Sequence, residues 1–280
     1  MTRSFSIAAL LQWACQILAQ QDSPQREAEI LLSYVLQCER SYLLAHGEKI
    51  ITQVQYKRYL LLLRRRQQSE PIAYLLGRRE FWSLDLQINS HTLIPRHETE
   101  LLVELILKIF RADQCITLAD LGTGCGAIAL AIASERPHWE IIASDNRQPV
   151  LALARSNAQR LAINNITFCA SDWCTALPEK NYDVIVSNPP YIAMNDVHLT
   201  QGDLPFEPQT ALVSGAEGLD AICIIAQQAT QYLKPSGYLY LEHGAAQAKR
   251  VADILSANGF NAINCYQDLA GLDRVTCGSY

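Results

Sequence analysis

The spacing of hydrophobic residues divides the chain into a helical N-terminal part and a longer part in which strand and helix patterns alternate. Apolar residues recur every three or four positions over residues 7–18, from residue 24 onward, and over residues 56–63, as they do on one face of a helix. Ser23-Pro24 fits the N-cap and first position of the second helix. The pattern predicts a small helical bundle over residues 1–78.

The pattern changes near residue 80. Apolar and polar residues alternate over residues 81–88 as in a strand, and Asn89-Ser90-His91 has the composition of a turn before residues 93–95. These features predict a β-hairpin linker over residues 79–95. A helical period returns over residues 99–110.

Strand and helix patterns alternate through the rest of the chain. Repeated strand–helix units imply a parallel sheet with helices on both faces. The last two strand-like stretches have only a short connection, which favours an antiparallel pair. An α/β domain is therefore predicted over residues 96–280. Its expected strands are 116–120, 141–145, 166–170, 182–187, 238–241, 261–266 and 273–280. Its expected later helices are one that begins near residue 127 and three that span 148–161, 220–233 and 245–258.

The amino-acid composition predicts a folded protein, and the spacing of its cysteines predicts no structural metal site. Of 280 residues, 49% are hydrophobic and 18% charged, which is far from the signature of disorder. Nine cysteines occur without a C-x-x-C pair, so neither a metal site nor a disulfide framework is expected. The N-terminus lacks a leader-like apolar segment, and no apolar run approaches the ~20 residues of a membrane span. We expect a cytoplasmic protein with no membrane partner.

Charge is distributed unevenly. Residues 1–90 hold 11 Lys/Arg against 8 Asp/Glu, whereas the remainder holds 12 against 20. The acidic remainder is poorly suited to neutralising the phosphates of duplex DNA. Arg64-Arg65-Arg66, at the end of the third helical run, can complement a helix C-terminus or touch an acidic partner.

A glycine-rich segment, Asp120-Leu-Gly122-Thr123-Gly124-Cys125-Gly126, stands where a predicted strand ends and a helix begins. Glycines at such a position let backbone N–H groups approach a ligand closely. The next strand ends in Asp145, whose carboxylate can accept hydrogen bonds from ribose hydroxyls. Together these residues predict a site for a nucleoside cofactor.

The type of cofactor is open at this point. Gly122-x-Gly124-x-x-Ala127 also satisfies the dinucleotide fingerprint of dehydrogenases, although Asp120 at the start of the loop favours a methyltransferase. Asp172-Trp173 follows the third strand, where an adenine would lie. Asp172 can accept from an exocyclic amine, and Trp173 can contact the ring or simply cover the core.

The tetrapeptide Asn188-Pro189-Pro190-Tyr191 directly follows the fourth predicted strand, at the edge where open α/β sheets bind ligands. Proline has no N–H, so this segment presents acceptors, the Asn188 side-chain oxygen and the Pro189 carbonyl. Two acceptors suit an NH2 group whose lone pair is conjugated, because its hydrogen bonds push electron density back toward nitrogen. We predict that these four residues are catalytic and bind the substrate, with Tyr191 flattening the substrate group against its ring.

The glycine loop, Asp145 and the Asn188–Tyr191 tetrapeptide together resemble the amino-methyltransferases of the class I S-adenosylmethionine fold. That resemblance implies an α/β fold with a Rossmann-like sheet of seven strands, the last antiparallel. Three substrate classes share the tetrapeptide: DNA adenine, ribosomal RNA guanine and protein glutamine. The residues expected to bind S-adenosylmethionine are Asp120, Gly122, Thr123, Gly124, Cys125, Gly126, Asp145, Asp172, Trp173 and Asn188.

The rest of the chain is similar to bacterial release factor glutamine methyltransferases over nearly its whole length. The segments that carry the similarity are residues 70–77 (EPIAYLLG), 93–100 (LIPRHETE), 207–219 and 273–275 (DRV). The similarity implies methylation, on N5, of the glutamine in the Gly-Gly-Gln loop of class I release factors. Residues 1–78 would then recognise the substrate, with no direct requirement for nucleic acid. His97, where proline is common, and Leu272, where arginine is frequent, depart from the pattern.

Two other functions stay open on the sequence alone. A nucleic-acid amino-methyltransferase would use the same pocket, but it predicts a strong basic stripe where the first 90 residues offer a surplus of three positive charges. A non-catalytic, ribosome-associated module predicts cofactor binding without turnover. Arg96, Glu98 and Glu100 have a structural interpretation, as acids with a nearby partner at a helix N-terminus.

Overall fold

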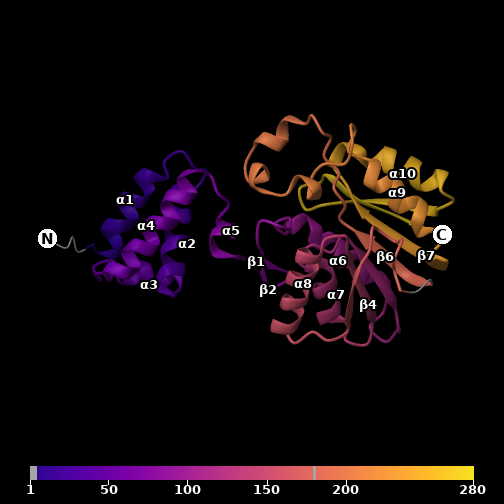
Figure 1. Cartoon of the computed structure of the whole chain (residues 1–280), viewed down its shortest axis with the longest axis horizontal. Coiled ribbons are helices and arrows are strands. Elements are labelled where there is room, and N and C mark those ends of the chain that lie inside the picture. The colour runs from indigo at the N-terminus through magenta and orange to yellow at the C-terminus, as the bar shows by residue number, and fades with distance from the viewer. Residues whose placement is uncertain (1–4, 179–180) are drawn as a thin grey trace. The chain divides into compact units, whose positions relative to one another are not determined.

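The computed structural model describes residues 5–178 and 181–280. It separates into two compact units, Met1–Gly77 and Arg78–Tyr280, whose elements are labelled in Figure 1. The first unit is helical, and the second combines helices with a seven-stranded sheet. The predicted α/β fold class with N-terminal helices is therefore confirmed.

The first unit is a helical bundle around one apolar core. Leu10, Leu32 and Leu63 come from its three longer helices and are fully buried together. Its two shortest helices lack a clear sequence signal, because five or six residues hold too few turns to establish a helical period. The elements are α1 (Ile7–Ile17), α2 (Pro24–Leu36), α3 (Arg40–Ala45), α4 (Gln53–Gln67) and α5 (Ile72–Leu76).

Two of the three arginines at the end of α4 are used inside this unit. The buried Arg66 guanidinium donates twice to the Glu27 carboxylate of α2, at 2.7 and 3.0 Å. Arg66 also donates to the carbonyls of Ser69 and Glu70, which lie just beyond the end of α4. Arg65 donates to the Glu70 carboxylate at 2.7 Å.

The second unit is built on a sheet with the strand order β5-β4-β3-β6-β7-β9-β8. The first five strands of that order pair in parallel, and β9 pairs antiparallel with both β7 and β8, so the antiparallel last strand is confirmed. The strands are β3 (Thr117–Leu121), β4 (Glu140–Asp145), β5 (Ile166–Ala170), β6 (Tyr182–Ser187), β7 (Leu233–Glu242), β8 (Asn261–Gln267) and β9 (Asp273–Ser279).

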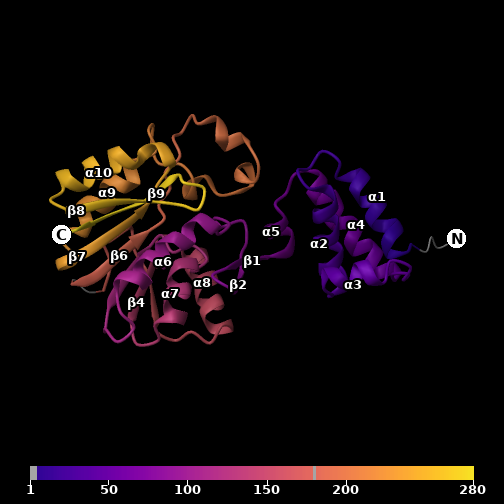
Figure 2. The same ribbon diagram turned by 180° about the vertical axis from the view of Figure 1, so that it is seen from behind.

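Helices cover both faces of this sheet. Figures 1 and 2 show α9 and α10 together on one side and α6, α7 and α8 toward the other. The predicted helix at 220–233 ends early, since β7 already begins at Leu233. The helices are α6 (Glu100–Ile109), α7 (Ala127–Glu135), α8 (Gln148–Arg160), α9 (Asp220–Ala229) and α10 (Ala248–Ala257).

The hairpin lies earlier in the chain than predicted. β1 (Arg78–Phe81) pairs antiparallel with β2 (Leu84–Gln87), so the single strand predicted over 81–88 is wrong. The turn predicted at 89–91 is present, since the Thr92 N–H donates to the Asn89 carbonyl at 3.1 Å, but it follows the hairpin. The turn of the hairpin itself is Trp82-Ser83, with φ of 50° and 58°. Neither residue favours the left-handed region. Distant contacts stabilise the turn, because Trp82 donates its backbone N–H to Glu100 at 3.0 Å and its indole N–H to Glu135 at 2.9 Å.

The described part of the chain holds neither a membrane-spanning helix nor a cluster of metal-binding side chains. No helix within residues 5–178 and 181–280 is long and apolar enough to cross a bilayer. The same ranges hold no group of three or more His, Cys, Asp or Glu side chains placed to bind a metal ion. All nine cysteines are free thiols.

Candidate active site

A cavity of about 620 Å³ opens at the carboxyl ends of β3, β4, β5 and β6. It brings together nine of the residues predicted from the sequence, which come from four separate segments. They are Gly122, Thr123, Gly124, Cys125, Asp145, Asp172, Trp173, Asn188 and Pro190. The cavity is also lined by residues that were not predicted to bind cofactor or substrate, namely Thr92, Leu93, Pro95, Thr99, Ala127, Ile128, Asn146, Arg147, Ser171, Thr210 and Ala211.

The glycine loop turns sharply between β3 and α7. Gly122 and Gly124 have φ of 67° and 59°, a region that residues with a Cβ rarely adopt. The Gly124 N–H donates to Asp145 Oδ2 at 3.3 Å, and the Thr123 N–H donates to the Ser144 carbonyl at 2.8 Å. The loop is thus attached to the end of β4, beside it in the sheet.

Asp120 lies beneath the glycine loop. It is 1% exposed, and its Oδ2 accepts from the Thr123 hydroxyl at 2.7 Å and from the Ala129 N–H in α7 at 3.2 Å. Burial raises the pKa of this carboxyl to about 7. Asp120 therefore connects the glycine loop to the first turn of α7 by hydrogen bonds.

Two further predicted acids, Asp145 and Asp172, stand at the end of β4 and just after β5. The Asp145 carboxylate accepts from Gly124 and from the Arg147 N–H at 3.0 Å, and burial raises its pKa. Ser171 builds the turn after β5 by donating its hydroxyl to the Trp173 carbonyl at 2.7 Å. Trp173 lines the cavity and also packs against the apolar core, so its contact with the core is confirmed, whereas its contact with an adenine ring stays a prediction.

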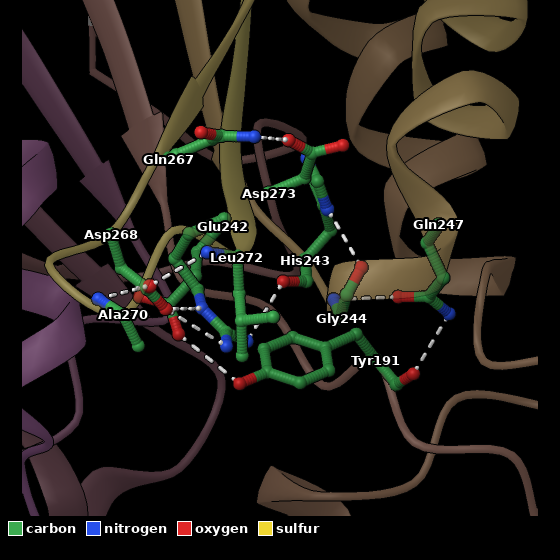
Figure 3. A network of polar contacts seen from close by, with 11 residues as sticks. Tyr191, Glu242, His243, Gly244, Gln247, Gln267, Asp268, Ala270, Leu272 and Asp273 are labelled. Carbon is green, nitrogen blue, oxygen red and sulfur yellow. Dashed lines mark hydrogen bonds and ion pairs between the residues drawn. The ribbon is translucent and has the colours of Figure 1, made fainter.

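In the tetrapeptide after β6, Asn188 and Pro190 line the cavity, whereas Pro189 and the Tyr191 hydroxyl lie in the protein interior. Asn188 Nδ2 donates to Thr99 Oγ1 at 3.0 Å, which leaves Asn188 Oδ1 as an acceptor for the cavity that both residues line. Pro189 is buried and Pro190 lines the cavity. The Tyr191 hydroxyl donates to Glu242 Oε1 at 3.2 Å and so points toward the end of β7, as Figure 3 shows.

The backbone of Tyr191 is held from a different direction. Gln247 Nε2 donates to the Tyr191 carbonyl at 3.0 Å, and Gln247 Oε1 accepts from the Gly244 N–H at 2.8 Å (Figure 3). Gly218 packs so closely that a Cβ on it would lie 2.2 Å from the same carbonyl oxygen. These contacts fix the tetrapeptide after its second proline.

Two loops that line the cavity, around residues 92–96 and 207–211, are joined by one buried carboxylate. Glu207, 4% exposed, accepts from the Ile94 N–H at 3.0 Å and pairs with the Arg96 guanidinium. The segments on either side contribute Thr92, Leu93 and Pro95, and Thr210 and Ala211, to the lining. Arg96 therefore has its partner, Glu207, far away in the sequence. Glu100, the first residue of α6, accepts a hydrogen bond from the Trp82 backbone N–H.

Asn157 of α8 is the main structural residue that the sequence did not reveal. It is fully buried, donates to the carbonyls of Cys125 and Gln87, and accepts from the Gln87 N–H. A polar residue within a helical run gives no sign of burial, and only its position on the same face of α8 as Val150 and Ala154 could have suggested it.

The arrangement has a clear chemical capacity. Backbone N–H groups, two strand-end acids and an aromatic ring suit a ligand that contains a nucleoside. The amide side chain of Asn188, which lines the same cavity and has its Nδ2 bound to Thr99, offers an oxygen that suits an NH2 group as the second reactant. The cavity can therefore hold a nucleoside-bearing group donor beside an amine or amide acceptor.

Comparisons with known proteins agree with this description. The PrmC N-terminal domain family matches residues 9–77, and the Methyltransferase small domain family matches residues 97–207. The release factor glutamine methyltransferase of Coxiella burnetii is 47% identical over 93% of this chain and 93% of its own length. The protein of that name from Salmonella typhimurium is 47% identical over 96% of this chain and 97% of its own length.

Solved structures share the fold at low sequence identity. A methyltransferase from Pyrococcus furiosus has a TM-score of 0.53 with 17% identity, covering 70% of this chain and 88% of that one. The ribosomal protein L11 methylase of Lactobacillus delbrueckii subsp. bulgaricus has a TM-score of 0.51 with 18% identity, covering 68% and 81%.

Proposed function

The chain belongs to the release factor glutamine methyltransferase family, and on that premise we propose that it methylates the side-chain N5 of the glutamine in the Gly-Gly-Gln motif of class I peptide chain release factors. The methyl donor is S-adenosylmethionine. The observation that carries the proposal is the Asn188 side chain, whose Nδ2 is bound to Thr99 Oγ1 at 3.0 Å. Its Oδ1 is therefore the atom available to an incoming amide.

The cavity residues fit S-adenosylmethionine by their chemistry. The N–H groups and tight turns of Gly122, Thr123 and Gly124 suit close approach of a charged ligand. Asp145 would hold the ribose hydroxyls, and Asp172 with Trp173 would enclose the adenine; all three line the cavity. When bound, the cofactor supplies a methyl group on a sulfonium, which is electrophilic without further activation.

The tetrapeptide would prepare the glutamine amide for attack. The amide nitrogen is a poor nucleophile because its lone pair is conjugated with the carbonyl. Asn188 Oδ1 and the Pro189 carbonyl would accept its two hydrogens, which returns electron density to nitrogen and fixes its direction. Orientation and exclusion of water then contribute more than a strong base would. Pro190 and the Tyr191 ring would restrict the amide plane.

The partner follows from the same proposal. Residues 1–78 would recognise the body of the release factor, and residues 79–95 would link them to the catalytic part. The reaction would need no nucleic acid, and it would take place in the cytoplasm, where release factors act. Removal of nucleic acid by nuclease treatment should accordingly leave methylation of a purified release factor unchanged.

The proposal is tested by peptide mass spectrometry. An unmethylated class I release factor is incubated with this protein and S-adenosylmethionine, and peptides that span the Gly-Gly-Gln motif are analysed. One methyl group on the glutamine is expected. A release factor in which that glutamine is replaced by glutamate provides the matched control and should stay unmodified. Methyl transfer to RNA or DNA in a parallel assay, with none to the release factor, would replace the proposed substrate.

A further inference from the structure

Thr99 links the tetrapeptide to the protein interior. It stands at the N-cap of α6, is 4% exposed and accepts from Asn188 Nδ2 at 3.0 Å. A threonine hydroxyl has one proton and two lone pairs. Since its oxygen receives the Asn188 hydrogen, the hydroxyl proton is left for another acceptor.

Glu242, at the end of β7, is the carboxyl group beside Thr99. It is 1% exposed and receives the Tyr191 hydroxyl at Oε1; burial raises its pKa, and the neighbouring Thr99 acts to lower it. Its Oε2 lacks a well-aligned donor within residues 5–178 and 181–280, so that atom has acceptor capacity to spare. An ionised carboxylate can only accept.

We propose that Glu242 and Thr99 are positioning residues that set the orientation of the Asn188 amide. Ionised Glu242 draws the Thr99 proton, the Thr99 oxygen then takes Asn188 Nδ2, and Asn188 Oδ1 is turned to the substrate amide. This inference rests on the proposed function, because it assigns Oδ1 the task of accepting from an NH2 group.

The direction of the chain of hydrogen bonds depends on the charge of Glu242. A protonated Glu242 can donate to Thr99, which can donate to Asn188 Oδ1 and turn Nδ2 toward the substrate. An N–H facing the N–H of the substrate amide would oppose binding in the reactive geometry. Burial raises the pKa of Glu242 to about 7. The other ionisable groups around it are Tyr191 after β6, Arg274 on β9 and Glu98 before α6.

The kinetic test compares Thr99→Val, which keeps the shape and loses the hydroxyl, with Thr99→Ser, which keeps the hydroxyl. We expect Thr99→Val to lower kcat roughly 10- to 100-fold, while the Kd for S-adenosylmethionine changes less than about threefold. Thr99→Ser should restore kcat to within about threefold of wild type. The same kcat for Thr99→Val and wild type would overturn the proposal.

A double-mutant cycle separates positioning from packing. Asn188→Ala alone should lower kcat roughly 10²- to 10³-fold with little change in cofactor affinity. If Thr99 acts through Asn188, adding Thr99→Val to Asn188→Ala should cost nothing more. Full additivity of the two losses would show that Thr99 acts by another route.

Glu242→Gln supplies a pH signature. Wild-type kcat should fall as pH drops below about 7, and the variant should be low and flat between pH 6 and 8. If the variant shows the same fall of kcat at low pH as wild type, the titration of Glu242 does not cause that fall. If Thr99→Val does not fold, the kcat of Thr99→Ser and the pH profile of Glu242→Gln test the proposal instead.

A titration without turnover tests the chain of hydrogen bonds apart from the proposed substrate. The side-chain carboxyl carbon of Glu242 is followed by NMR in protein labelled with carbon-13 glutamate. Loss of its donor in Thr99→Val should raise the Glu242 pKa, and Thr99→Ser should not. An unmoved pKa would overturn the inference even if the release factor is methylated. A raised pKa with no methylation would instead count against the proposed function alone.

Discussion

The side-chain amide of Asn157 donates to the Cys125 carbonyl at 2.9 Å. The same side chain exchanges two hydrogen bonds with the backbone of Gln87, at 2.8 and 2.9 Å. One fully buried amide thus joins α8, the glycine loop and β2. The conformation of the glycine loop therefore depends on an element that does not line the cavity.

Replacement of Asn157 by alanine should loosen this junction. The backbone groups of Gln87 and Cys125 would lose buried partners, so we expect the free energy of unfolding to fall by about 2–4 kcal/mol. The Kd for S-adenosylmethionine should rise roughly tenfold. Urea denaturation and titration calorimetry measure the two effects. Asn164→Ala, at an exposed position with one long 3.5 Å contact, is the control and should change stability by less than about 0.5 kcal/mol.

Gly218 should not tolerate a side chain. A Cβ there would meet the Tyr191 carbonyl oxygen at 2.2 Å, so Gly218→Ala must displace the tetrapeptide or its own loop. We expect kcat to fall roughly 100-fold through misplacement of Asn188. Gly271→Ala is the matched control, because Gly271 has the same φ of 75° with open space around its Cα. Equal activity of the two variants would contradict the role of this contact.

Much of the second unit could be predicted from the sequence because its elements carry local signals. β3, β4 and β6 end at Leu121, Asp145 and Ser187, and the glycines, acids and prolines at these strand ends are typical of a ligand-binding edge, so the cavity could be inferred before its geometry was known. The short β1–β2 turn could not be inferred. Trp82 and Ser83 adopt left-handed conformations, and Trp82 is held there by Glu100 and Glu135; such distant partners leave no local pattern.

The same limit applies to the supporting residues of the site. Arg96 and Glu207 lie far apart in the chain, as do Thr99 and Glu242. Their pairing depends on how the sheet brings its loops together. Sequence patterns identified many of the residues that line the cavity, whereas the residues that hold them in place were recognised only from tertiary contacts.

The buried carboxyl of Asp120 should make stability depend on pH. Its pKa is about 7 in the folded protein, against an ordinary value of 3.8, so between these values the folded state holds a proton that the unfolded state has released. The stabilisation is complete below about pH 4 and is lost as pH rises through 7. Burial of Asp145 and Glu242 acts in the same direction.

Asp120→Asn removes this titration. Between pH 5.5 and 8, the free energy of unfolding should decline less steeply in Asp120→Asn than in wild type, by up to about 1.4 kcal/mol per pH unit. Urea denaturation at several pH values measures the slopes. Asp113→Asn controls for a change of charge at an exposed position. Parallel slopes for Asp120→Asn and wild type would rule out Asp120 as a source of the dependence.

The ion pair between Arg96 and Glu207 should control the width of the cavity mouth. The Glu207 side chain is 0% exposed, and burial raises its pKa even beside Arg96. Arg96→Met leaves this carboxylate buried without its cation, which is more costly than loss of the pair as a whole. Glu207→Gln keeps an acceptor for the Ile94 N–H, so its effect should be smaller.

We expect Arg96→Met to raise the Kd for S-adenosylmethionine roughly 10- to 100-fold at pH 8, since the loops that carry Pro95 and Thr210 would separate. The loss should be smaller at pH 5.5, because protonation of Glu207 removes the uncompensated charge. Glu207→Gln should cost roughly threefold at both pH values. Asp253→Asn breaks the exposed pair with Lys249 and should leave Kd unchanged. A wild-type Kd for Arg96→Met at pH 8 would show that the mouth is held by other contacts.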